Sequence, residues 1–346
     1  MGLYLIKPQY RPSPIRSVAA LARGLRWDAQ ALEELAERAN GLWRTVKPKP
    51  GSTRQTFDAL GQLKEVHLRL KLNVFSKVDF PEYLQGSLKG RDYVTNASLH
   101  KNKQILICED VKGFFPSVGA AFVEDVWCGF FRFAPDVAKL LTKLTTKDGY
   151  LPQGAITSSF LANLVMWRHE PLLHAKLAQR GITYSRYVDD MVMSAATHLD
   201  KETQTWVIAQ VYGMLAQHGL KASRKKHEVF SASQPMIATK LIVNRKPSLS
   251  PKKRSQVRTQ IRQLEMAAAN GADTDELRNL ANKAVQRVGQ LGRFHKTPAA
   301  KLKSRIAVVR SNLSPEGLST ATEPTNVSRS SDHLTRCATC AGPQGS

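Results

Sequence analysis

The first third of the chain shows two stretches of helical periodicity separated by two short runs that resemble strands. Apolar residues recur at helical spacing through residues 17–41 and 58–75, which predicts helices there; the first is either continuous or broken near Trp27. Residues 42–46 and 53–57 flank a basic segment rich in proline and glycine, which predicts two strands joined by a turn. Such a basic turn suits a triphosphate, and a solvated loop is the alternative.

Two acidic centres interrupt the apolar pattern further along. Residues 104–108 are mostly apolar and lead into Glu109 and Asp110, which predicts a buried strand that ends at Asp110. In residues 182–194, apolar and polar residues partly alternate around Asp189-Asp190, which predicts two strands with both carboxylates at a tight turn. Adjacent carboxylates repel each other, and a bound divalent cation relieves the repulsion. For this turn taken alone, an ordinary hairpin is the alternative.

The remainder of the chain is mostly helical in pattern. Helical spacing extends to about residue 143, continues through 160–179 and returns at 201–217, before an apolar run at 236–243 that predicts a strand. Two further helices are predicted to begin at Ser250-Pro251 and at Asp273, where capping residues precede helical spacing. From residue 311 onward serine, threonine, proline and glycine dominate, which predicts a disordered tail.

The charge of the chain indicates a class of partner. The 346 residues include 51 Lys or Arg and 28 Asp or Glu, a net charge of +23, and 42% are hydrophobic. A folded protein of this charge is expected to bind a polyanion, most simply nucleic acid. Residues 245–310 hold 16 Lys or Arg against 4 Asp or Glu, with Arg254, Arg258 and Arg262 along one helix. This basic helical region suits contact with a phosphate backbone, and a solvated surface is the alternative.

Other classes of protein are disfavoured. No run approaches 18 uninterrupted apolar residues, so we expect no membrane-spanning helix and no membrane partner. The 4 cysteines are sparse for a disulfide framework, which favours a reducing cytoplasm. A DNA-binding regulator would need a recognition motif, and we find none.

Asp110, Asp189 and Asp190 form a candidate catalytic set. One carboxylate ends a predicted strand, and two lie at a predicted hairpin turn about 80 residues later. Three acidic oxygen donors on adjoining strands can hold two Mg²⁺ ions roughly 3.5–4 Å apart, an arrangement that supports in-line phosphoryl transfer. Mg²⁺ takes its other ligands from water and substrate phosphates, so three protein carboxylates suffice.

Further motifs accompany these aspartates, in an order and at spacings shared with one family. They are Arg54 followed by Leu63-Lys64, Gly86-x3-Gly90-Arg91, Asn96-Ala97-x2-His100, Asp110-x3-Phe114-Phe115-Pro-Ser, Leu151-Pro-Gln-Gly, Tyr187-Val-Asp-Asp, Gly219-Leu and Lys226. On these residues, the sequence from about residue 35 to 305 resembles the bacterial reverse transcriptases, most closely the retron type. The Asn-Ala-x2-His element favours retrons. Val188 stands where the family usually has alanine.

The resemblance implies an α+β fold of the right-hand polymerase type, with fingers, a palm that carries a small antiparallel sheet, and a helical thumb. We predict an N-terminal helical segment at 1–41, fingers at 42–105, a palm at 106–240 with a finger insertion at about 130–180, a basic helical thumb at 241–310, and a disordered tail at 311–346.

The resemblance also implies roles for individual residues. They are metal binding by Asp110, Asp189 and Asp190; catalysis by these three and by Lys226, which would protonate the departing pyrophosphate; nucleotide binding by Arg54, Val111, Phe115 and Gln153; and RNA binding by Asn96, His100, Arg254, Arg258 and Arg262. Phe115 would lie beneath the sugar and exclude a 2′-hydroxyl. A core aromatic is the alternative for Phe115, and a structural hydrogen-bonding residue is the alternative for His100.

The implied function is that of a retron RNA-directed DNA polymerase. Such an enzyme uses two Mg²⁺ ions and dNTPs to copy its cognate noncoding RNA into single-stranded DNA that stays linked to the RNA (msDNA). Retron enzymes start at a 2′-hydroxyl of their own RNA and usually act in antiphage defence beside an effector protein of the same locus. The alternatives are a group II intron-like or other defence-associated reverse transcriptase, and a catalytically dead RNA-binding scaffold, which retention of all three aspartates disfavours.

Overall fold

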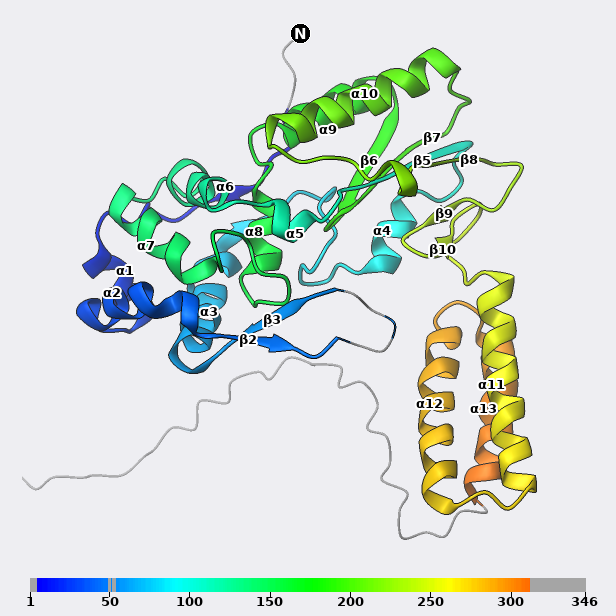
Figure 1. Cartoon of the computed structure of the whole chain (residues 1–346). Coiled ribbons are helices and arrows are strands. Elements are labelled where there is room, and N and C mark those ends of the chain that lie inside the picture. The colour runs from blue at the N-terminus through cyan, green and yellow to red at the C-terminus, as the bar shows by residue number, and fades with distance from the viewer. Residues whose placement is uncertain (1–4, 49–50, 52–53, 312–346) are drawn as a thin grey trace, which may run out of the picture. The chain divides into compact units, whose positions relative to one another are not determined.

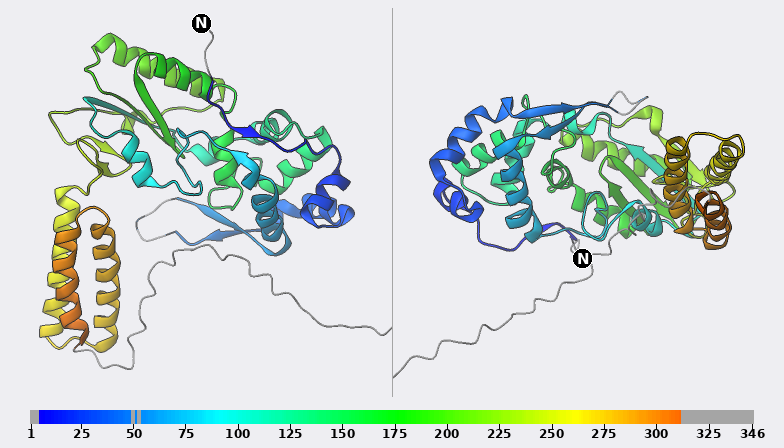
Figure 2. Two further views of the ribbon diagram at one scale, coloured as in Figure 1. Left: turned by 180° about the vertical axis from the view of Figure 1, so that it is seen from behind. Right: turned by 90° about the horizontal axis from the view of Figure 1, so that it is seen from below.

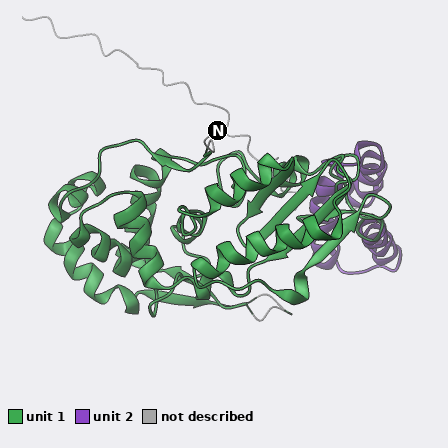
Figure 3. Cartoon of the chain, turned by 90° about the horizontal axis from the view of Figure 1, so that it is seen from above, with its two compact units in different colours: residues 1–254 green, residues 255–346 purple. Residues whose placement is uncertain are grey.

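The computed structural model describes residues 5–48, 51 and 54–311. The chain forms two compact units, residues 1–254 and 255–346, which are described separately (Figure 3). Of the predicted disordered tail only Ser311, the last residue of a helix, is described, so the prediction for residues 312–346 lies outside the described residues. Residues 49–50 and 52 of the predicted basic turn, and residue 53 at the start of the predicted second strand, also lie outside them.

The N-terminal helical region consists of two helices, α1 (Val18–Leu25) and α2 (Ala29–Arg38). Arg26 ends α1 in the left-handed conformation with φ 52°, and the Asp28 side chain then caps α2 by accepting a hydrogen bond from the Ala31 N–H. The broken version of this prediction is therefore the right one. The leucines of both helices are buried together with helix α3 (Gly61–Asn73) in one hydrophobic core.

The predicted basic hairpin is present, with a later second strand. Strands β2 (Trp43–Val46) and β3 (Thr56–Ala59) pair antiparallel, from Trp43 opposite Ala59 to Val46 opposite Thr56. The second strand begins three residues later than residue 53, which the sequence pattern predicted. Two short strands, β1 (Gln9–Tyr10) and β4 (Val78–Asp79), form another antiparallel pair.

A four-stranded antiparallel sheet forms the centre of the first unit, with strand order β6-β7-β5-β8. Its strands are β5 (Ile105–Asp110), β6 (Ile182–Tyr187), β7 (Asp190–Ala195) and β8 (Glu228–Ser231). The strand that ends at Asp110 and the Asp189-Asp190 hairpin were both predicted, and both are confirmed. Strand β8, at the sheet edge, was not predicted.

Helices cover both faces of this sheet. Helices α9 (Glu170–Gln179) and α10 (Lys201–Gln217) lie along one face, and α4 (Tyr93–Leu99) lies on the other (Figures 1 and 2). Successive strand residues point to opposite faces. Tyr184 and Arg186 of β6 accordingly bond to Glu170 of α9, whereas Ser185 between them bonds to Asn96 of α4.

The segment between β5 and β6 supplies most of the aromatic core. It contains α5 (Phe114–Ser117), α6 (Ala120–Asp125), a π-helical turn (Val126–Phe130), α7 (Pro135–Thr145) and α8 (Ser158–Leu164). The rings of Trp127 and Phe131 stack with centroids 5.0 Å apart, and both are fully buried beside Phe75. These rings belong to the main hydrophobic core of the first unit.

The apolar run at 236–243 forms a hairpin, which corrects the prediction of a single strand. Strands β9 (Ile237–Ala238) and β10 (Leu241–Ile242) pair antiparallel. Thr239 and Lys240 between them have φ values of 43° and 70°, so the chain reverses there. The sequence offers no glycine or asparagine at this turn, and the apolar pattern alone therefore concealed it.

The C-terminal helices were predicted in part. Helix α11 (Pro251–Ala269) crosses into the second unit, which also contains α12 (Thr274–Gly292) and α13 (Lys296–Ser311). Asp273 caps α12 as predicted, and the third helix was not predicted. Arg258 and Arg262 are exposed on α11. The limits of the predicted fingers, palm and thumb remain a prediction.

Candidate active site

Strand register places two carboxylates side by side. Asp110, the last residue of β5, lies directly opposite Asp190, the first residue of β7, so both side chains point to the same face. The two carboxyl groups are close enough for Asp110 to raise the pKa of Asp190. Lys226, in the 3-10 turn Arg224–Lys226, places its Nζ 2.6 Å from Asp110 Oδ2.

Asp189 completes this group at the turn between β6 and β7. Its backbone carbonyl accepts a 3.0 Å hydrogen bond from the N–H of Val111, which ties the hairpin turn to the end of β5. Burial raises the pKa of the Asp189 carboxyl, and the charge of Asp110 raises it further. The three predicted aspartates are therefore together at one end of the sheet.

The electrostatics of this group fit a divalent cation. Burial, followed by the charges of Asp189 and Asp110, raises the pKa of Asp190 from 3.8 to about 6. All the donors are carboxylate oxygens, the type that hard cations prefer, and their repulsion is what a cation relieves. In the described part of the chain, no three Asp, Glu, His or Cys side chains are close enough to share one ion. The fit therefore rests on the facing Asp110 and Asp190 residues with Asp189 next to them in the turn.

A cavity of about 660 Å³ opens beside the carboxylates and brings together the predicted nucleotide-binding residues. Its lining includes Arg54, Asp110, Val111, Phe115, Gln153, Asp189 and Lys226. The cavity is large enough for a small polar ligand. Its lining has cationic side chains from the β2–β3 hairpin and the 3-10 turn, and two carboxylates at the sheet end.

Close backbone packing shapes one wall of this cavity. The Gln153 carbonyl accepts a 2.8 Å hydrogen bond from the Phe57 N–H of β3, so the Leu-Pro-Gln-Gly loop is fastened to the hairpin. Gly154 has φ 104°, and a Cβ there would lie 2.9 Å from the Phe57 carbonyl oxygen. Only glycine satisfies both constraints, which explains the residue that follows Gln153.

Lys147 and Tyr150 also line the cavity, and the sequence reasoning did not select them. The Lys147 Nζ lies 5.1 Å from the centroid of the Phe57 ring, a cation–π distance, and Lys147 also pairs with Asp148. Lys147 and Tyr150 form two backbone hydrogen bonds with each other across a tight turn. The signal available was a lysine beside an Asp148-Gly149 turn, just before the Leu-Pro-Gln-Gly motif.

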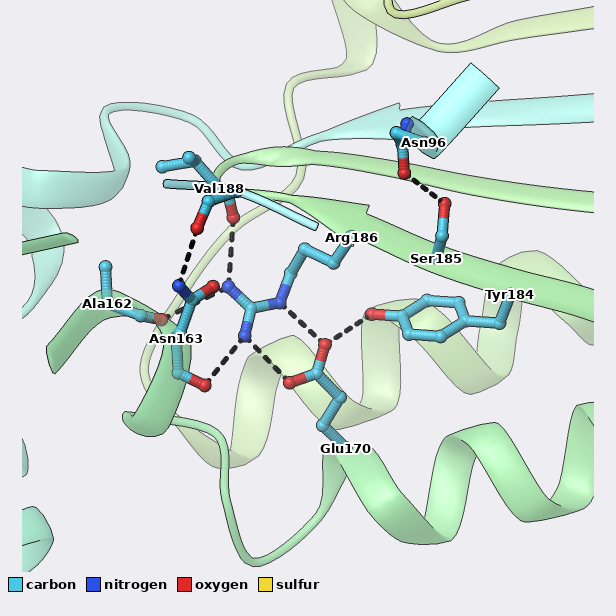
Figure 4. A network of polar contacts seen from close by, with 9 residues as sticks. Asn96, Ala162, Asn163, Glu170, Tyr184, Ser185, Arg186 and Val188 are labelled. Atoms are coloured by element: carbon cyan, nitrogen blue, oxygen red, sulfur yellow. Dashed lines mark hydrogen bonds and ion pairs between the residues drawn. The ribbon is translucent and has the colours of Figure 1, made fainter. Parts of the chain in front are cut away.

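Asn96 and His100 are buried, which corrects the prediction that they contact RNA directly. Both side chains are 0% exposed. Asn96 Oδ1 accepts a 2.7 Å hydrogen bond from Ser185 (Figure 4), and the His100 ring nitrogens bond to Ser185 and Ser194, each at 2.7 Å. Burial lowers the pKa of His100 to about 3. These residues hold α4 against strands β6 and β7.

The chain matches a family of known enzymes. The family model described as "Reverse transcriptase (RNA-dependent DNA polymerase)" matches residues 46–258. The protein is thus an RNA-directed DNA polymerase. Its α+β fold, with the Asp110–Asp190 pair at one end of the central sheet beside the cavity, is a right-hand polymerase fold. Enzymes of this class use divalent metal ions, an RNA template and dNTPs.

Curated relatives define the type more closely. The retron Se72 reverse transcriptase of Salmonella heidelberg is 30% identical over 88% of this chain and 82% of its own length. Two Escherichia coli proteins, the retron Ec48 and Ec86 reverse transcriptases, are each 25% identical, over 86% and 70% of this chain and 77% and 76% of their own lengths. The chain belongs to the retron reverse transcriptases.

Among the described helices, none is long and apolar enough to cross a membrane.

Proposed function

We propose that this protein copies its cognate noncoding RNA into msDNA, starting from a 2′-hydroxyl of that RNA, with Asp110, Asp189 and Asp190 as ligands of two Mg²⁺ ions. The observation that carries the proposal is the pairing of Asp110 with Asp190 beside the 660 Å³ cavity. Two bound ions would supply charge stabilisation to the attacking and leaving oxygens. Side chains of the cavity would bind the nucleotide, select its sugar and transfer a proton.

Arg54, Gln153 and Lys226 would act on the incoming nucleotide. Arg54 and Lys226 place cationic groups in the same cavity as the carboxylates, which suits a triphosphate. Lys226 donates to Asp110 and is half exposed, with 52% of its side chain accessible. This exposure supports the proposal that its ammonium group hands a proton to the departing pyrophosphate.

Phe115 and Val111 would shape the sugar-binding part of the cavity. Phe115 lies half-buried on α5, and Val111 follows Asp110 directly. An aromatic ring at the sugar would itself offer no hydrogen bond to a 2′-hydroxyl and would occupy the space it needs. We therefore expect selection for deoxynucleotides.

Exposed arginines of α11 would bind the phosphate backbone of the RNA. Each lost phosphate contact lowers the slope of log affinity against log salt by about 0.7 to 0.9. The double variant Arg258→Gln/Arg262→Gln should therefore weaken RNA binding and flatten its salt dependence. Fluorescence anisotropy with the cognate RNA between low and moderate salt measures both quantities.

The decisive experiment is extraction of nucleic acid from the protein purified out of cells that carry its native flanking DNA. RNase treatment should slightly shorten a discrete single-stranded DNA of fixed length, because part of the product is RNA. The Asp189→Ala/Asp190→Ala variant should yield no such DNA. Primer extension on a supplied RNA template without any bound DNA would keep the polymerase and refute msDNA synthesis. Absence of both activities would favour an RNA-binding scaffold.

A role in antiphage defence beside an effector protein belongs to the same proposal and rests on kinship with retron enzymes. Cells that carry the complete locus should resist phage, and Asp189→Asn should abolish that resistance. Full resistance with Asp189→Asn would show that DNA synthesis is not what protects the cell, again in favour of a scaffold.

A further inference from the structure

We propose that Arg186, held by Glu170, is a positioning residue that fixes the backbone turn carrying Asp189 and Asp190; the inference rests on the proposed role of these aspartates. Arg186 is 0% exposed, directly before the Tyr187-Val-Asp-Asp motif, and lies on the face of β6 opposite α4 (Figure 4). A fully buried arginine beside a catalytic turn requires a reason, because burial of an unpaired charge is costly.

All five N–H donors of Arg186 are used. The Nε–H and one N–H of Nη2 donate hydrogen bonds to the two carboxylate oxygens of Glu170, at 2.6 and 2.8 Å. The other three reach backbone carbonyls, of Ala162 at 3.1 Å, Asn163 at 3.1 Å and Val188 at 3.0 Å. Glu170 is itself 1% exposed and neutralises the guanidinium, while Tyr184 donates a further 2.8 Å hydrogen bond to it. The network thus connects α8 and α9 to the hairpin turn.

The carbonyl of Val188 is the critical acceptor, because Val188 has an unfavourable backbone conformation. Its φ is 62°, in the left-handed region that β-branched residues rarely occupy. Such a conformation persists only where surrounding structure over-determines it. Arg186 supplies one of these restraints through its bond to the Val188 oxygen.

Gly86 supplies a second restraint from the other side of the turn. A Cβ at Gly86 would lie 2.5 Å from both the Val188 nitrogen and its Cγ2, so the two backbones touch. Asn163 holds this glycine through a 2.8 Å hydrogen bond from its Nδ2 to the Gly86 carbonyl. Because the Asn163 carbonyl also accepts from Arg186, both restraints belong to one network.

The backbone is therefore held on both sides of Asp189. Arg186 fixes the carbonyl before it, and the Val111 N–H fixes the carbonyl of Asp189 itself at 3.0 Å. With both carbonyls held, the backbone direction from which the Asp189 side chain projects is held as well. Because its donors all bond to Glu170 and to backbone carbonyls, Arg186 would act on the aspartates through this turn.

Arg186→Lys tests the inference, with Tyr184→Phe as the matched control. Lysine keeps the buried charge beside Glu170 but has three donors instead of five, so it cannot hold Glu170 and all three carbonyls. Tyr184→Phe removes one hydrogen bond from the same carboxylate and none from the turn. Loss of contacts that support metal ligands, as in Arg186→Lys, typically costs about 10- to 100-fold in metal affinity or activity.

Two readouts separate positioning from general stability. In primer extension, Arg186→Lys should lower kcat about 10- to 100-fold, raise the Mg²⁺ concentration for half-maximal rate, and leave KM for dNTP within about twofold. In hydrogen exchange of the metal-free protein, the peptide covering residues 187–191 should exchange faster in Arg186→Lys. Tyr184→Phe should match the wild type in both readouts.

Equal behaviour of the two variants, with both folded, would overturn the proposal. If the wild type itself lacks polymerase activity, the proposed function fails, and hydrogen exchange still decides the role of Arg186. If Arg186→Lys does not fold, Gly86→Ala takes its place, since it presses on Val188 with the arginine intact and should give the same kinetic signature. A Gly86→Ala protein with wild-type kcat, Mg²⁺ dependence and exchange would also refute the proposal.

Discussion

Replacement of Asp190 by asparagine should stabilise the metal-free protein while it abolishes DNA synthesis. In the folded protein the pKa of Asp190 is raised from 3.8 to about 6 by burial and by its two acidic neighbours. This difference corresponds to about 3 kcal/mol, since one pKa unit is worth about 1.4 kcal/mol. Asparagine is nearly isosteric, carries no charge and can donate a hydrogen bond to Asp110.

The sign of the pH dependence follows from the same shift. Because the folded state holds the proton on Asp190 more tightly, the wild type loses stability as the pH rises from about 4 to about 6, and the loss is complete by about pH 7. Asp190→Asn escapes this loss. At pH 8 in EDTA its melting temperature should rise by up to about 6 to 12 °C, at 2–4 °C per kcal/mol. The value is an upper bound because Asp190 is half-buried and water screens part of its charge.

Thermal unfolding followed by circular dichroism between pH 5 and pH 8 measures this effect. The matched control is Asp58→Asn, where hydrogen bonds and ion pairs with Lys64 and Arg44 lower the pKa of the carboxyl, so the same substitution should destabilise. Added Mg²⁺ should stabilise the wild type more than Asp190→Asn. An Asp190→Asn protein no more stable than wild type at pH 8, or a gain that does not shrink toward pH 5, would refute the electrostatic reasoning.

Three further substitutions test other parts of the structure. Glu170→Ala leaves the Arg186 charge buried without its partner and should cost about 3–5 kcal/mol in urea unfolding, whereas a loss below 1 kcal/mol would mean that water reaches the arginine. Val188→Ala relieves a β-branched residue at φ 62° and should raise the melting temperature slightly, with a primer-extension rate within about twofold of wild type; a large loss of rate would show that the valine side chain itself is needed. Phe115→Ala should increase ribonucleotide incorporation in single-nucleotide extension assays at least about tenfold, since it opens the sugar-binding part of the cavity, and unchanged selectivity would assign Phe115 to the core.

The central strands were predictable because their signals are local. The apolar run before Asp110 and the alternation around Asp189-Asp190 each fit one strand period, and the structure has both strands there. The short edge strand β8 is mostly exposed, so its sequence gave no such signal. The β9–β10 hairpin turns at Thr239-Lys240, where neither residue is a usual turn former, so tertiary packing decides the conformation.

The residues of the candidate site also divide into those that the sequence predicted and those that only the structure shows. The aspartates, Arg54, Phe115, Gln153 and Lys226 were selected from motif order, and the structure gathers them at one cavity or its edge. Glu170 could not be selected, because its partner Arg186 is 16 residues away and nothing in the sequence marks a buried ion pair. Asn96 and His100 were misassigned because a motif reveals that polar residues matter, while burial decides whether they face a ligand or the protein interior.

The neighbour of Asp110 has a consequence for how the chain selects its fold. Glu109 precedes Asp110, so β5 ends in two acids, and a slip of one residue in its pairing with β7 would present glutamate where aspartate belongs. Glu109 is 2% exposed on the opposite face, where His227 bonds to it at 2.7 Å and Tyr212 lies 3.4 Å away. In a slipped strand, Glu109 would lose its contacts with His227 and Tyr212, and Asp110 would point to that face instead. Glu109 thus favours the observed alignment of the strands, and the placement of Asp110 opposite Asp190 depends on a buried carboxylate on the other face of the sheet.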